Sequence, residues 1–93
     1  MEDGEMYILV FTDNFQRVMR NLQKKNPTLV QSLVTRFPKL TRNPELGKPL
    51  RNSLRNFRRM HVEGSFVLLY EIRMSEVHLM DFDHHDKIYK KYT

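Results

Sequence analysis

The chain has 93 residues and a formal net charge of +5, with 40% hydrophobic residues and no cysteine. Its length predicts a single globular domain over residues 1–93, and the lack of cysteine excludes disulfides, thiolate metal sites and cysteine nucleophiles. The acidic N-terminal segment and the absence of a long apolar run predict a cytoplasmic protein with no signal peptide and no membrane span.

The first half of the chain predicts one strand followed by two helices. Residues 6–11 form an apolar, aromatic-rich run typical of a buried strand. Thr12-Asp13-Asn14 offers capping side chains to a helix over residues 15–25, whose apolar positions have helical spacing. A second amphipathic helix is expected over residues 27–40, with Asn26 as its cap and Pro27 in its first turn, and Pro38 should kink or end it. The two helices are expected to form an antiparallel hairpin.

The second half of the chain predicts a loop, three strands and a short tail. The loop is residues 43–49. Strands are expected over residues 54–62, 65–72 and 76–82. Glu63-Gly64 reads as the tight turn of a hairpin, and residues 84–89 as a short helix or extended segment. The order βααβββ predicts an α+β fold, with the helical hairpin on one face of a mostly antiparallel four-stranded sheet.

Positive charge is concentrated in the middle of the chain. Between residues 14 and 60 there are twelve Lys and Arg residues and one acidic residue, Glu45, which gives 12 − 1 = +11. The other four basic and ten acidic residues lie toward the two ends. This distribution indicates a polyanionic partner, either nucleic acid or an acidic protein. The alternative is a solvated basic surface.

Three local motifs occur in the order and spacing of a known family. Residues 59–72 read as a basic strand, a Glu-Gly turn and an apolar strand ending Tyr-Glu-Ile. His85-x-x-x-Tyr89 ends the chain, and Lys48-Pro49-Leu50 begins thirteen residues before His61. Together they resemble toxins of the RelE/ParE superfamily, nearest the RelE/YafQ-like mRNA interferases, and the resemblance covers residues 7–89.

The chain departs from that family at three positions. RelE proper usually has an Arg at the place of Val67, whereas YafQ-like members have an Asp at the place of Ser65 and a His at the place of Lys48. The sequence therefore falls between the two branches, which bears on catalytic rate more than on fold.

The resemblance implies the toxin of a type II toxin–antitoxin system that cleaves mRNA in the ribosome without a metal or other cofactor. A cognate antitoxin with an acidic, partly flexible segment is the implied partner. In metal-independent cleavage a base deprotonates the 2′-OH, which attacks the adjacent phosphate, cations hold the growing charge, and an acid protonates the 5′-oxygen. Histidine suits both proton transfers, and Lys and Arg suit the charge.

The resemblance and the strand alternation together select candidate catalytic residues. His85 is the leading proton-transfer residue, and Tyr89 is expected to stack on a base or, alternatively, to pin the tail to the core. Alternation places His61 on the open face of its strand beside Arg55 and Arg59, although a surface histidine without function is equally compatible with the pattern. The remaining candidates are Lys48 as a catalytic cation and five RNA- or phosphate-binding residues, Arg51, Arg55, Arg58, Arg59 and Arg73, with Arg73 as readily a solvated side chain.

Three other interpretations stay open. One is a ParE-like inhibitor of DNA gyrase without nuclease activity, and another is a catalytically decayed relative that binds RNA or only its antitoxin. Asp81 and Asp83 should share a face, and His85 could join them as metal ligands, but no second ligand cluster supports a metal site.

Overall fold

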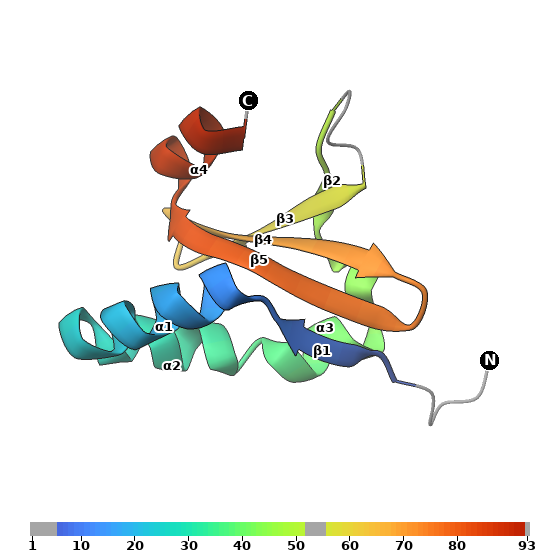
Figure 1. Ribbon diagram of the computed structural model, residues 1–93, viewed down its shortest axis with the longest axis horizontal. Helices are drawn as coiled ribbons and strands as arrows, with labels where there is room; N and C mark the ends of the chain where they lie inside the picture. The colour runs from blue at the N-terminus through green and yellow to red at the C-terminus, as the bar shows by residue number, and fades with distance from the viewer. Residues whose placement is uncertain (1–5, 52–55, 93) are drawn as a thin grey trace.

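The computed structural model describes residues 6–51 and 56–92 (Figure 1). Its strands are β1 (Ile8–Phe11), β2 (Lys48–Pro49), β3 (Phe57–Val62), β4 (Phe66–Arg73) and β5 (Glu76–His84). Its helices are α1 (Asp13–Lys25), α2 (Pro27–Val34), α3 (Phe37–Arg42), the 3₁₀ helix η1 (Pro44–Leu46) and α4 (His85–Tyr92). No helix in this part of the chain is both long and apolar enough to cross a membrane.

The sheet has five strands in the order β1-β5-β4-β3-β2. Strand β1 is parallel to β5 and all other neighbours are antiparallel, so the predicted α+β fold with a mostly antiparallel sheet is confirmed. The strand count was one too low. The fifth strand, β2, lies inside the predicted loop, where Lys48 pairs with Arg59 and Pro49 with Arg58. Two residues are too few for the pattern of alternation to reveal a strand.

Strand β1 was predicted to be buried, and this was wrong. It lies at the outer edge of the sheet with β5 on one side only. Ile8 is 62% exposed and Phe11 is 45% exposed. An apolar run of this length is compatible with a central or an edge strand, and only the sheet topology separates the two.

Side-chain caps fix the starts of the first two helices, as predicted. The Thr12 hydroxyl accepts a hydrogen bond from the N–H of Phe15 at 3.2 Å, which caps α1. The Asn26 side chain accepts one from the N–H of Leu29 at 3.1 Å, which caps α2 before its first residue, Pro27.

The predicted second helix is divided into two. Helix α2 ends at Val34, and α3 starts at Phe37 with Pro38 in its first turn. Proline is tolerated there because the first N–H groups of a helix have no partner within the helix. The break therefore precedes Pro38, and the proline begins the new helix.

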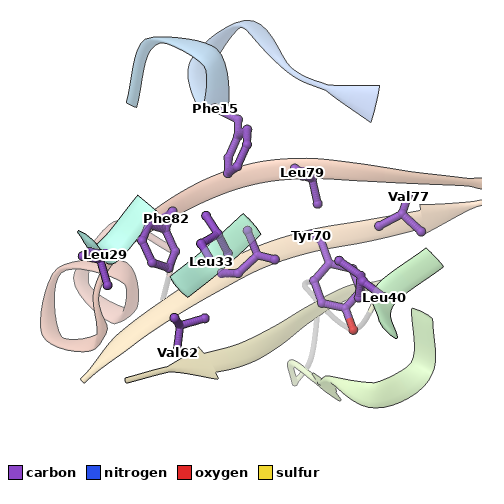
Figure 2. Packing of buried hydrophobic residues seen from close by; sticks show 10 residues of the cluster. Phe15, Leu29, Leu33, Leu40, Val62, Tyr70, Val77, Leu79 and Phe82 are labelled. Atoms are coloured by element: carbon purple, nitrogen blue, oxygen red, sulfur yellow. The ribbon is translucent and has the colours of Figure 1, made fainter. Parts of the chain in front are cut away.

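The core lies between the α1–α2–α3 layer and one face of the sheet (Figures 1 and 2). Its helical side chains are Phe15, Leu29, Leu33 and Leu40, and its sheet side chains are Val62, Leu68, Tyr70, Val77, Leu79 and Phe82. Burying each large apolar side chain stabilises the fold by about 1.5–3 kcal/mol. This layer fixes the sheet and leaves its other face for α4.

A β-bulge at Met80 changes which face the end of β5 presents. Leu69 pairs with Asp81 and Tyr70 with Leu79, so Met80 is the extra residue. Simple alternation along β5 would place Asp81 on the same face as Leu79 and Phe82 on the opposite face. In the structure Phe82 joins the core, and Asp81 lies on the opposite face.

Helix α4 covers that opposite face by packing on β4 and β5 (Figure 1). Val67 and Leu69, which point away from the main core, are fully buried. Ile88 of α4 is 1% exposed. The tail is thus a helix with its own small apolar contact. It folds over the face of the sheet that strand alternation had indicated as the open one.

Candidate functional site

Strand register gathers three of the candidate residues, Lys48, Arg59 and His61, in two adjacent rows on the α4 face of the sheet. One row is Lys48, Arg59, Leu69 and Asp81, and the next is His61, Val67 and Asp83. Directly paired residues share a face, and diagonal neighbours lie about 7–8 Å apart. Lys48 and His61 therefore flank Arg59, and both of these outer side chains are exposed.

The start of α4 is tied to the β3–β4 hairpin. The N–H of His85 donates a hydrogen bond to the carbonyl of Ser65 at 2.8 Å. Ser65 follows the turn residues Glu63 and Gly64, which have φ values of 54° and 77°. This bond brings His85 to the end of the sheet where His61 lies, so the two candidate histidines occur at the same end of the same face.

Tyr89 connects His85 to the basic row. Its ring centroid is 6.2 Å from that of His85, and the guanidinium carbon of Arg59 lies 5.9 Å from the Tyr89 centroid. A cation over an aromatic face at this distance is attracted to the ring. The Nε of Arg59 is buried and has no hydrogen-bond partner within the described residues.

Lys48 is positioned by a loop that Tyr70 holds in place. The Tyr70 hydroxyl donates to the carbonyl of Pro44 at 2.6 Å and accepts from the N–H of Gly47 at 2.8 Å. Burial of this side chain raises the pKa of Tyr70. A Cβ at residue 47 would lie 2.5 Å from the Tyr70 oxygen and 2.6 Å from the Arg59 carbonyl. The close approach therefore requires glycine immediately before Lys48.

Arg58 does not join the group on the α4 face. It pairs with Tyr70 and faces the core side of the sheet, where its Nη1 donates to the carbonyls of Gly47 at 2.7 Å and Glu45 at 3.3 Å. These bonds make Arg58 a support for the loop that carries Lys48.

Two other predicted phosphate-binding residues lie outside the cluster, and a third cannot be placed. Arg73 pairs with Glu71 at 3.0 Å and is six residues from Val67 along β4, or about 20 Å at roughly 3.3 Å per residue. Arg51 is exposed and lies beyond the end of β2. Arg55 falls outside the described residues.

His84, His85 and Asp86 form an adjacent polar group. The two imidazole rings stack at 4.7 Å, and His85 Nδ1 lies 2.9 Å from Asp86 Oδ1. One ligand atom from each residue falls within 4.8 Å of the others, so the three side chains have the donor types and spacing for a cation. In this geometry Asp86 orients the His85 ring, since a carboxylate at Nδ1 fixes the orientation of an imidazole.

The sequence did not reveal a polar cluster that forms around the buried Asp81. Lys91 Nζ lies 2.8 Å from Asp81 Oδ2 and 3.3 Å from Asp83 Oδ2, and the Tyr92 hydroxyl donates to Asp81 Oδ2 at 2.9 Å. We call these four residues the α4 clamp. Lys91 thus occupies the space between the two aspartates that had been considered as metal ligands. The alternation in β5 suggested the shared face of the aspartates, but nothing in the sequence identified Lys91 and Tyr92 as their partners.

The fold and the site together can be compared with those of known protein families. A helical hairpin covers one face of the sheet, and a C-terminal helix brings His and Tyr to a basic row on the other. Residues 9–89 match the family described as the ParE toxin of the type II toxin–antitoxin system parDE. A candidate toxin of Methanocaldococcus jannaschii, RelE4, is 33% identical over 88 residues, covering 92% of this chain and 94% of the relative.

Solved structures agree. The toxin–antitoxin complex RelBE2 from Mycobacterium tuberculosis contains a chain 30% identical to this one, with a TM-score of 0.70, covering 90% of this chain and 97% of that one. YafQ from E. coli BL21(DE3) shares the fold at 17% identity, with a TM-score of 0.64 and coverage of 89% and 98%. This chain therefore belongs to the RelE/ParE superfamily of type II toxin–antitoxin toxins, as its motifs had indicated.

Proposed function

We propose that the chain is a ribosome-dependent mRNA endonuclease that cleaves by acid–base chemistry. One observation carries the proposal: α4 brings His85 and Tyr89 to the row formed by Lys48 and Arg59, at the end of the sheet that carries His61. Proton-transfer groups and cations on one exposed face match the requirements of phosphodiester cleavage by a neighbouring 2′-OH.

In the proposed reaction, one imidazole takes the proton from the 2′-OH as the 2′-oxygen attacks the adjacent phosphorus. Lys48 and the Arg59 guanidinium stabilise the charge on the non-bridging oxygens. The other imidazole protonates the 5′-oxygen as its bond to phosphorus breaks. The products are a 2′,3′-cyclic phosphate and a free 5′-hydroxyl, and no redox step is involved.

The direct test compares two histidine variants on programmed ribosomes. His85→Ala should lower the single-turnover cleavage rate by roughly 100-fold or more, the usual contribution of a positioned acid or base. His78→Ala is the matched control, because His78 lies on β5, the strand that leads into α4, but toward the other end of the sheet, where it pairs with Glu76. Equal rates for the His85→Ala variant and the unchanged chain would contradict the proposal.

The family description favours gyrase inhibition as a second candidate, since the matching family is that of parDE toxins. That function does not require the histidines. A supercoiling assay with purified gyrase separates the two candidates: inhibition that His85→Ala leaves unchanged, without RNA cleavage, would support the ParE-like activity.

The proposed partner is a cognate antitoxin, because related toxins have been solved as complexes, RelBE2 in M. tuberculosis and DinJ–YafQ in E. coli. A cleft of about 580 Å³ between α1 and α2 offers a surface for an acidic amphipathic segment. Val34 is 41% exposed there, and Arg20 and Lys24 contribute positive charge to the lining. This complementarity favours the antitoxin's acidic segment as the occupant.

A further inference from the structure

The end of α4 is held by a buried charge that the proposed reaction does not use. Asp81 is 1% exposed, yet its carboxylate accepts from Lys91 and the Tyr92 hydroxyl through Oδ2 and from the N–H of Phe82 at 2.8 Å through Oδ1. A buried carboxylate is tolerated only when it is paired and hydrogen-bonded. Both side-chain partners come from the last turn of α4, so the buried charge and the helix position depend on each other.

Helix α4 is too short to hold its position alone. It has eight residues, and isolated helices below about 12–15 residues are marginal in water. Its start is fixed by the bond from His85 N–H to Ser65, and its middle by Ile88. Its end is fixed by the α4 clamp. Tyr89 lies in the same turn as Lys91 and Tyr92, between these attachments.

The β-bulge that presents Asp81 is itself held by the start of α1. The Thr12 hydroxyl donates to the carbonyl of Leu79 at 2.7 Å, and the Asn14 side chain donates to the carbonyl of Met80 at 2.9 Å. Both bonds end on the backbone of the bulge, and Asp81 is the next residue after the bulge. Contacts from the first helix thus fix the strand irregularity that turns Asp81 toward the last helix.

We propose that Asp81 is a positioning residue, which acts through Lys91 and Tyr92 to hold α4 so that Tyr89 and His85 stay aligned with Arg59. This inference rests on the proposed function. It assigns no contact with RNA to Asp81. Loss of the α4 clamp should release the last turn of α4, lowering turnover while the sheet and its basic row remain intact.

The test compares Lys91→Met with Lys90→Met. Both changes remove one positive charge from the last turn of α4, but Lys90 is exposed and is not one of the four clamp residues. Lys91→Met should speed hydrogen exchange of the α4 amides by roughly ten-fold or more, while β4 and β5 amides stay protected. Asp81→Asn should also speed exchange of the α4 amides. If the Asp81→Asn variant does not fold, Lys91→Met still decides the test.

Cleavage on programmed ribosomes gives the second readout. Relative to Lys90→Met, Lys91→Met should lower kcat by roughly ten-fold with KM changed by less than about two-fold, and Lys91→Arg should restore kcat. Two results would overturn the positioning role of Asp81: unchanged hydrogen exchange of α4 in Lys91→Met, or faster exchange of α4 with an unchanged kcat. Absence of cleavage by the unchanged chain would instead overturn the proposed function, and the exchange data would still decide whether the clamp holds α4.

Discussion

Arg59 is the residue where the candidate site is most constrained. Its neighbours in the row are Lys48 and Leu69, its guanidinium lies over the Tyr89 ring, and its Nε is buried without a hydrogen-bond partner in the described parts of the chain. The arrangement uses features that lysine lacks, namely a planar group that stacks on a ring and donates in several directions. Arg59 therefore has a role that charge alone does not fill.

Arg59→Lys should reduce cleavage even though it conserves charge. We expect a fall of roughly ten-fold or more in the single-turnover rate, because the stacked, multidentate contact to phosphate is lost. Arg73→Lys is the control, since Arg73 lies at the far end of the sheet and pairs with Glu71. Similar rates for the two variants, with folding checked by circular dichroism, would refute this role of Arg59.

The pKa values of Lys91 and Tyr92 in the α4 clamp predict that the protein loses stability at alkaline pH. Burial lowers the pKa of Lys91, but its bonds and attraction to Asp81 and Asp83 outweigh this and raise it above 10.5. Burial and the hydrogen bond to Asp81 raise the pKa of Tyr92 above 10.0. With both values higher in the folded state, their contribution is fully present below pH 10 and is lost as pH rises through the folded values.

Thermal unfolding from pH 8 to pH 11.5 measures this limit. The unchanged chain should be more stable than a Lys91→Met, Tyr92→Phe double variant at pH 8, and the difference in Tm should shrink above about pH 10. A difference that stays constant across this range would contradict the raised pKa values of Lys91 and Tyr92, because both groups would then titrate alike in the folded and unfolded chain.

Among the structural elements, the short segment before β2 controls where Lys48 lies. Tyr70 and Arg58 bind its backbone from the core side, and Gly47 lets the segment approach Arg59 closely. The local sequence revealed a loop here but not a strand, because the bonds that stabilise it come from residues 11 to 26 positions away. Strand alternation in the sequence identified the face on which His61 and Arg59 lie. The position of Lys48 depends on tertiary contacts that the local sequence does not show.

Gly47→Ala should destabilise the fold by about 1–3 kcal/mol, since the added Cβ would collide with the Tyr70 hydroxyl and the Arg59 backbone. Urea unfolding measures the change. Gly64→Asn serves as control, because its turn has φ of 77° with open space around the Cβ position, and asparagine tolerates that conformation. Equal destabilisation by the two changes would contradict the packing argument.

At the scale of the whole molecule, the two faces of the sheet differ in what lies on them. One packs on α1, α2 and α3 to form the core, and the other carries the basic row and α4. Much of this was predictable from sequence: the α+β class, both helix caps, the β3–β4 turn and the face of His61. The edge position of β1, the bulge at Met80 and the α4 clamp were not, since each depends on a partner distant in sequence.

The outer side of the α1–α2 layer should serve the antitoxin without affecting cleavage. Val34→Glu places a negative charge in an apolar, basic-rimmed cleft and should weaken antitoxin binding by roughly ten-fold or more. Growth rescue by a co-expressed antitoxin, selected from a genomic library, measures this. Met74→Glu is the control at an exposed apolar residue elsewhere. Full rescue of the Val34→Glu toxin would exclude the cleft as the binding surface.

The central claim is that this face of the sheet cleaves mRNA through His85. Its most direct test is to express the unchanged chain, His85→Ala and His78→Ala from a tightly controlled promoter and to map new RNA 5′ ends in the cells. We predict growth arrest and new 5′-hydroxyl ends within translated messages for the unchanged chain and His78→Ala, and neither for His85→Ala. Arrest without new ends, or identical ends from the His85→Ala variant, would contradict the claim.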